Sequence, residues 1–299
     1  MNRIFPYILI ATGASLWGLI AFFVKGLSDF GFSPMEIVAI RVTYAALILL
    51  ILGFFSFRNQ MKLNKAADIR LFIGTGILSI VFFNFCYFTT ISQMNISIAV
   101  ILLYTSPAFV TVLSFIFLKE SLTLTKIVAV IGTIIGCILI AGISTGDSNI
   151  TTLGIITGLG SGLGYALYTI FGKFALEKYQ PFTITMYTFL IAAIALIPTT
   201  QLWEKMDLIL NPYVLFYGIG LAFFPTVLAF ILYTRGLEKI EGSKAAIIAT
   251  VEPVVATMLG VLLYGERLGA IQIAGALLIL CSVIIVNISF RKKQVSSAV

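Results

Sequence analysis

One segment of the sequence occurs twice, and the spacing of its two copies constrains the fold more than any other feature. The segments TSPAFVTVLSFIFLKE and VEPVVATMLGVLLYGE align Pro107 with Pro253 and Glu120 with Glu266, at one offset of 146 residues. The same offset aligns further pairs, namely Ser15 with Ser161, Gly18 with Gly164, Gly74 with Gly220, Tyr87 with Tyr233 and Ser97 with Ser243. Because 146 is close to half of 299, we interpret the chain as an internal duplication with units 1–146 and 147–299.

The chain is too apolar to fold around a soluble core. Hydrophobic residues make up 60% of the sequence and charged residues 10%, and the mean hydropathy is +1.10. A helix needs about 20 mostly apolar residues to cross a bilayer. The sequence offers ten such runs, at 5–24, 35–56, 70–91, 97–118, 126–145, 152–172, 182–200, 213–234, 244–264 and 269–290. It therefore predicts an all-α, multi-pass protein of a bacterial-type plasma membrane, with ten transmembrane helices, five in each unit.

Lysine and arginine are distributed unequally between the two sides of these helices. With the N-terminus placed inside, the inner segments hold 15 of the 19 cations, and Arg41 lies within the second helix. The outer segments hold only Lys25, Lys205 and Arg267. This distribution predicts cytoplasmic N- and C-termini. It also explains the net charge of +7 without a nucleic acid partner, because the charge lies in short loops rather than on one broad patch.

The odd number of helices in each unit decides how the two units are oriented. A second unit of five helices enters the membrane from the side opposite to the first, so the duplication is inverted. Inverted repeats are typical of alternating-access transporters, whose substrate site lies near the midplane where the two halves meet. A duplication retained for stability alone is the alternative.

Several motifs then resemble one transporter family. The paired P-x12-E segments, Leu16-Trp17-Gly18 in the first helix, Arg41 in the second and the inverted layout resemble the drug/metabolite transporter superfamily, EamA family. The resemblance implies a five-helix EamA-like repeat in each unit and a central cavity lined by helices one, three, four, six, eight and nine, with helices five and ten at the periphery. It also implies a small-molecule substrate, such as an amino acid or a related metabolite, that is often moved outward.

Two charged residues are predicted to lie within the membrane. Glu252 precedes Pro253 in mid-membrane, where an ionised carboxylate is costly unless it is paired or solvated. Glu252 is a candidate proton carrier or ligand for a cationic group; the alternative is a structural carboxyl that is protonated or paired with Arg41. For Arg41, the sequence favours a local pair or a side chain that reaches the outer surface, and an anchor for a substrate carboxylate is the alternative.

Polar and aromatic residues at helical spacing predict the lining of a cavity. The predicted faces are Asn84, Tyr87, Phe88 and Ile91 in the third helix, Ile101, Tyr104, Thr105 and Ala108 in the fourth, and Ser161, Tyr165 and Tyr168 in the sixth. The substrate-binding candidates are Trp17, Asn84, Tyr87, Tyr104, Tyr165, Tyr168 and Glu252. Such residues suit a small, partly apolar solute; packing between helices is the alternative.

Three prolines and one pair of tyrosines are candidates for a role in conformational change. Pro107, Pro225 and Pro253 fall near the middle of their predicted helices, where each removes a backbone hydrogen bond. They are predicted kinks, serving either as flexible points or as static bends. Tyr87 lies near the outer end of helix three and Tyr233 near the inner end of helix eight, which makes them candidate outer and inner gates. Interfacial belt tyrosines are the alternative.

The residues that are absent narrow the function further. The chain has no histidine, which removes Ser-His catalysis and most metal sites, so neither an enzyme nor a cofactor or metal site is expected. We predict a secondary transporter that exports a small metabolite, with protons as one option for the coupling ion. Broad efflux of drugs or cationic compounds is the alternative, and a non-transporting sensor or enzyme is disfavoured. Glycine pairs such as Gly132-x3-Gly136 favour close helix packing, and a homodimer through helices five and ten stays open.

Overall fold

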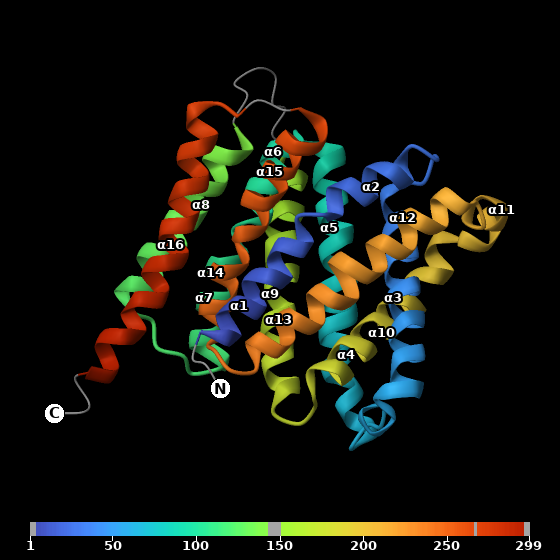
Figure 1. The fold of residues 1–299 in the computed structure, drawn as a ribbon, viewed down its shortest axis with the longest axis horizontal. Helices are drawn as coiled ribbons and strands as arrows, with labels where there is room; N and C mark the ends of the chain where they lie inside the picture. The colour runs from blue at the N-terminus through green and yellow to red at the C-terminus, as the bar shows by residue number, and fades with distance from the viewer. Residues whose placement is uncertain (1–3, 143–150, 266–267, 296–299) are drawn as a thin grey trace.

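The computed structural model describes residues 4–142, 151–265 and 268–295, and all regular elements in these segments are helical (Figure 1). The first half contains α1 (Phe5–Trp17), α2 (Ile20–Ser28), α3 (Pro34–Ser56), η1 (Arg58–Gln60), η2 (Ala66–Asp68), α4 (Ile69–Ile73), η3 (Gly74–Val81), α5 (Phe82–Gln93), α6 (Ile96–Leu103), α7 (Ser106–Phe117) and α8 (Leu124–Ala141). The second half contains α9 (Thr152–Leu176), α10 (Pro181–Thr200), η4 (Leu202–Lys205), α11 (Met206–Ile209), α12 (Pro212–Ala222), η5 (Phe223–Leu228), α13 (Ala229–Leu237), α14 (Gly242–Ala249), α15 (Val251–Tyr264) and α16 (Ala270–Val295).

These elements form the predicted set of membrane helices. In the described segments, nine helical spans are long and apolar enough to cross a membrane, and α16 adds a shorter apolar helix over Ala270–Val286. This agrees with a ten-helix, all-α membrane protein. The start of α1 and the end of α16 lie on the same side of the bundle (Figure 1), which is the side that the cation distribution assigns to the cytoplasm.

Two spans that the sequence predicts as kinked helices are instead broken into two helices each. The fourth span stops at Leu103 and resumes at Ser106, and the ninth span stops at Ala249 and resumes at Val251. Pro107 and Pro253 therefore lie in the first turns of α7 and α15, where the missing N–H costs no helical hydrogen bond. This corrects the expectation of a kink in a continuous helix at these two prolines.

The eighth span stays helical at Pro225, but its hydrogen-bonding pattern changes there. Residues Phe223–Leu228 form π-helical turns, η5. Pro225 has no N–H to donate to the carbonyl oxygen of Leu221. This oxygen instead accepts a 2.8 Å hydrogen bond from the Thr226 hydroxyl. The third span contains a second π-helical segment, η3. Such segments are frequent at functional sites because they change which residues face a neighbouring helix.

The fifth and tenth spans pack against each other at one edge of the bundle (Figure 1). Gly136 of α8 and Gly275 of α16 bring the two backbones together: a Cβ at Gly136 would lie 2.8 Å from the Gly275 carbonyl oxygen. Glycine is required here by the close approach of the helices. The Gly132-x3-Gly136 pair thus serves packing within the chain.

Candidate functional site

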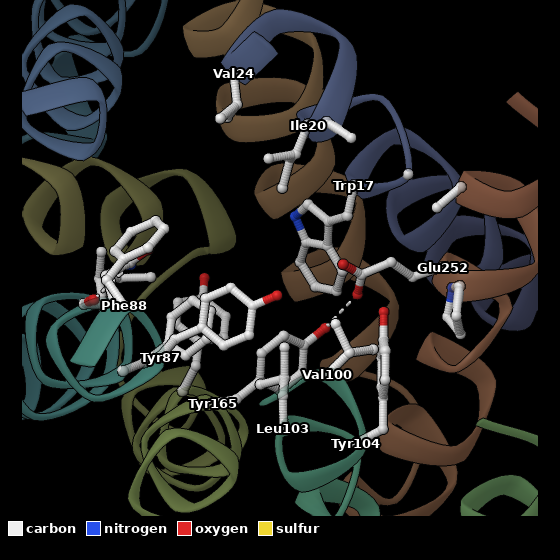
Figure 2. Close-up of a pocket in the computed structure, with 18 of the residues that line it drawn as sticks. Trp17, Ile20, Val24, Tyr87, Phe88, Val100, Leu103, Tyr104, Tyr165 and Glu252 are labelled. Atoms are coloured by element: carbon white, nitrogen blue, oxygen red, sulfur yellow. Dashed lines mark hydrogen bonds between the residues drawn. The ribbon is translucent and has the colours of Figure 1, made fainter. Parts of the chain in front are cut away.

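A cavity of about 610 Å³ lies at the centre of the bundle. The six spans expected to line it all contribute residues, and the second and fifth spans add Arg41 and Ile140. All seven residues selected from the sequence line this cavity: Trp17, Asn84, Tyr87, Tyr104, Tyr165, Tyr168 and Glu252. Figure 2 labels five of them, all except Asn84 and Tyr168. Their part in substrate binding stays a prediction, but the structure brings them together.

The cavity extends toward one side of the bundle only. Its lining includes Lys25, Ile91 and Ile96, which lie at helix ends on the side opposite to the start of α1. Toward the other side it stops at Thr169 and Tyr233, well before the ends of α9 and α13. With cytoplasmic termini, this arrangement faces outward.

Glu252 lies in the first turn of α15 and reaches the cavity. Its Oε2 accepts a 3.0 Å hydrogen bond from the Tyr165 hydroxyl (Figure 2). Among the described residues, no cation lies within ion-pair distance of Glu252, although Arg41 and Glu252 interact electrostatically at longer range. A carboxyl group is therefore accessible at the centre of the membrane with one hydrogen bond from the protein.

Arg41 does not reach the outer surface, which was one of the two favoured options for it; the other, a local partner, agrees with its hydrogen bonds. The side chain is 9% exposed, and its Nε donates a 2.7 Å hydrogen bond to the Thr226 hydroxyl. A second guanidinium nitrogen lies 3.4 Å from the carbonyl oxygen of Pro225. Both acceptors lie in the π-helical turns of η5, which face α3. Their hydrogen bonds hold the guanidinium at the cavity wall.

The predicted face of the fourth span was only partly right. Tyr104 lines the cavity, but Ile101, Thr105 and Ala108 do not; Ile96, Val100 and Leu103 of α6 take their place. The end of α6 at Leu103 stops the helical spacing from continuing to Thr105 and Ala108. Ile101 lies off the face that Ile96, Val100 and Leu103 share at spacings of four and three residues. Ser161 of α9 is also absent from the lining, because its hydroxyl is buried and donates to the Gly158 carbonyl at 2.7 Å.

Sequence reasoning missed other lining residues. Phe83, Phe230 and Lys25 belong to the cavity. Phe83 lies one helical turn before Tyr87 in α5, so the spacing that joins Tyr87 and Ile91 also includes it. No pattern distinguishes Phe230 from the other apolar residues of its span, and the sequence places Lys25 only among the cations of the outer segments.

Hydrogen bonds close the inner end of the cavity. The Tyr233 and Thr169 hydroxyls lie 2.7 Å apart, and so do those of Tyr168 and Thr234. Tyr233 is 2% exposed, whereas Tyr87 lies in the outer half of the cavity and packs on Phe83. The two gate candidates thus lie toward opposite ends of one cavity, and their gating role remains a proposal.

The first P-x12-E motif ends at a buried cluster on the inner side. The Glu120 carboxylate contacts the start of α14 and lies 3.6 Å from the Lys126 ammonium nitrogen. Its counterpart in the second motif, Glu266, lies outside the described residues.

Known proteins resemble this chain along most of its length. A family model described as the EamA-like transporter family matches residues 4–142 and 152–288. An uncharacterized transporter of Archaeoglobus fulgidus is 30% identical over 290 residues, covering 94% of this chain and 98% of that protein. The threonine/homoserine exporter RhtA of Salmonella typhimurium is 26% identical over 248 residues, covering 83% of this chain and 78% of the exporter. A solved structure described only as a protein shares the fold with a TM-score of 0.76 at 14% identity, covering 97% of this chain and 99% of its own.

Proposed function

Because the chain belongs to the EamA-like transporter family of the drug/metabolite transporter superfamily and is a multi-pass membrane transporter, we propose that it exports a small zwitterionic metabolite of the amino-acid class. We propose alternating access as the mechanism. The outward-facing cavity between inverted halves supports this, because rocking of the halves about a central site is how such repeats work.

The observation that carries the proposal is the placement of two opposite charges in one cavity. Arg41 and Glu252 both line it, yet each is held by neutral partners, Thr226 and Tyr165, rather than by the other charge. Charges within a membrane are costly unless they are paired. A zwitterion supplies the missing partner to each, with its carboxylate toward Arg41 and its ammonium toward Glu252. The similarity to a threonine/homoserine exporter agrees with this substrate class.

Protons are the coupling ion that the site favours. A carboxyl group that faces a cavity and lacks a cationic partner can take up a proton when no ammonium group is bound. Substrate and proton would then compete for Glu252, which is the exchange that a proton-driven exporter needs. The carboxylate is held by one hydroxyl and remains accessible from the cavity.

A second candidate is broad efflux of lipophilic or cationic compounds. The wall around Ile20, Val24, Phe83 and Phe88 is apolar and aromatic, which suits lipophilic cations as well as amino acids. Under this alternative, Arg41 has no ligand role. Unrelated organic cations would compete with one another, and compounds without a carboxylate would be exchanged as well as amino acids.

Counterflow in proteoliposomes tests the proposal. Labelled amino acids and amines are offered with and without a pH gradient, to the wild type and to Glu252→Gln. Saturable exchange of an amino acid that responds to the gradient only in the wild type supports a proton-coupled carrier. Exchange that is indifferent to both changes indicates a facilitator in which Glu252 is structural. Exchange of amines alone supports the efflux alternative.

A further inference from the structure

The two oxygens of the Glu252 carboxylate have different surroundings. Oε2 accepts the hydrogen bond of Tyr165 at 3.0 Å. Oε1 accepts none from the residues that the structure describes. The side chain is only partly buried, since one side of it borders the cavity. One oxygen is therefore occupied by the protein, and the other is left for a ligand.

Tyr165 is held firmly in the position from which it donates. Its ring contacts Trp17 edge-on, with centroids 5.9 Å apart and an interplanar angle of 75°. It contacts Phe83 in the same way, at 5.7 Å and 85°. Edge-to-face contacts on two sides restrict the ring, so the direction of the hydroxyl is fixed by packing.

Aromatic rings complete the surroundings of the carboxylate. Tyr104 interacts electrostatically with Glu252, and Trp17 packs on Tyr165, the residue that donates to Glu252; Figure 2 labels all four side chains. Trp17 is itself held by Phe230 and Tyr233, each with its ring centroid 5.1 Å away. Ring faces attract cations, most strongly when the site is shielded from water. A carboxylate flanked by a tryptophan and tyrosines is suited to an alkyl ammonium group.

We propose that Glu252, Trp17 and Tyr104 form a subsite for the primary ammonium group of the substrate, and that Tyr165 is the residue that positions it. Tyr165 occupies Oε2 and so turns Oε1 toward the ammonium, which donates to it. This subsite rests on the proposed function and assigns one end of the substrate to one wall of the cavity. Tyr165 touches the carboxylate and acts through it.

The chain provides a matched control for Tyr165. Tyr187 of α10 also makes one hydroxyl hydrogen bond, to the Met61 carbonyl oxygen at 2.7 Å, and it does not line the cavity. Tyr165→Phe and Tyr187→Phe each remove one hydroxyl from a partly buried tyrosine. Only Tyr165→Phe removes a group that holds Glu252.

The test compares ligands that carry different charges. The labelled probe is the amino acid that the wild type exchanges fastest in proteoliposomes. The competitors are that amino acid unlabelled, the amine left by removing its carboxylate, and the carboxylate left by removing its amino group. Tyr165→Phe is expected to raise the half-inhibitory concentrations of the amino acid and of the amine about 10-fold, and that of the carboxylate by less than about 2-fold. Tyr187→Phe, outside the cavity, is expected to leave all three half-inhibitory concentrations unchanged.

Two results would overturn the subsite. One is an equal change for all three competitors in Tyr165→Phe, which indicates a structural role; the other is no change at all. If Tyr165→Phe does not reach the membrane, Glu252→Gln provides the comparison, and a retained preference for the amine over the carboxylate overturns the subsite. A wild type that exchanges neither amino acids nor amines overturns the proposed function as well, so the two failures are distinguishable.

Discussion

The carboxylate of Glu120, which follows α7, accepts a 2.5 Å hydrogen bond from the hydroxyl of Ser243 at the start of α14. The backbone N–H of Gly242 donates to the same carboxylate, also at 2.5 Å. Free N–H groups at the start of a helix favour a negative charge. Glu120 is 8% exposed, so this contact fastens the inner ends of the two halves beneath the outward-facing cavity.

Glu120→Gln is predicted to loosen this inner contact. Hydrogen bonds to a charged group contribute about 1.5–3 kcal/mol each, so neutralising the group is expected to raise the population with an open inner side about 10-fold or more. The measurement is the distance distribution between spin labels at Leu122 and Arg235, both exposed on the inner side, by double electron–electron resonance. Glu238→Gln, which removes an exposed pair with Lys239, is the control. Equal distributions for both variants would contradict the prediction.

Glu241 is predicted to make stability depend on pH. Burial alone raises the pKa of this carboxyl, but the hydrogen bond from Lys244 and the charge of Lys126 outweigh it, so the pKa lies below the usual 4.5. The stabilisation is present above pH 4.5 and is lost as the pH falls through the lowered pKa. The difference in thermal unfolding midpoint between wild type and Glu241→Gln should therefore be largest near neutrality and disappear in acid. A difference that grows in acid would reverse this assignment.

Gly136→Ala is predicted to destabilise the pairing of α8 with α16. The added Cβ would lie 2.8 Å from the Gly275 carbonyl oxygen, a backbone atom that cannot rotate away. Overpacking of this kind costs about 1–3 kcal/mol, which should lower the unfolding midpoint of the purified protein in detergent. Gly172→Ala is the matched control, because its Cβ would first meet the Leu237 side chain at 3.5 Å. Alanine also favours a helix over glycine there.

The overall fold could be predicted from the sequence because its causes are local. Continuous apolar runs require membrane helices, and the alignment of Pro107 with Pro253 predicts a duplication without any tertiary contact. The cavity residues followed from polar and aromatic side chains spaced along single helices. Glu252 stood out because a carboxylate in mid-membrane needs an explanation.

The remaining details depend on contacts between segments distant in sequence. Arg41 stays inside because Thr226 and Pro225 accept its hydrogen bonds, and both acceptors lie in the π-helical turns of η5, distant from Arg41 in sequence. The break at Tyr104 and Thr105 comes just before Ser106 and Pro107, so the sequence marked a bend there but not where the first helix ends. The expected face was therefore carried across the break to Thr105 and Ala108, neither of which lines the cavity.

The gate hypothesis predicts unequal effects for two aligned tyrosines. Tyr233 closes the inner end through Thr169, whereas Tyr87 lies in the outer half of an open cavity. In this outward-facing state, Tyr233→Ala should let a thiol reagent supplied from the cytoplasmic side reach a cysteine at Ser79, another lining residue, in a chain without native cysteines. Tyr87→Ala should not. If neither alters labelling or transport rate, the tyrosines do not act as gates.

Arg41→Lys is predicted to separate carboxylate recognition from general binding. Lysine keeps the positive charge but lacks the planar guanidinium group. In the wild type this group donates to the Thr226 hydroxyl and has further N–H groups that can bind a carboxylate in a bidentate way. The half-inhibitory concentration of a carboxylate-bearing ligand should rise about 10-fold, while that of the matching amine should stay within about 2-fold. Thr226→Val removes the acceptor of Arg41 and keeps the guanidinium; it should give the same pattern, more weakly. Equal losses for amine and amino acid would show that Arg41 supports only the packing of α3 against η5, and would favour the efflux alternative.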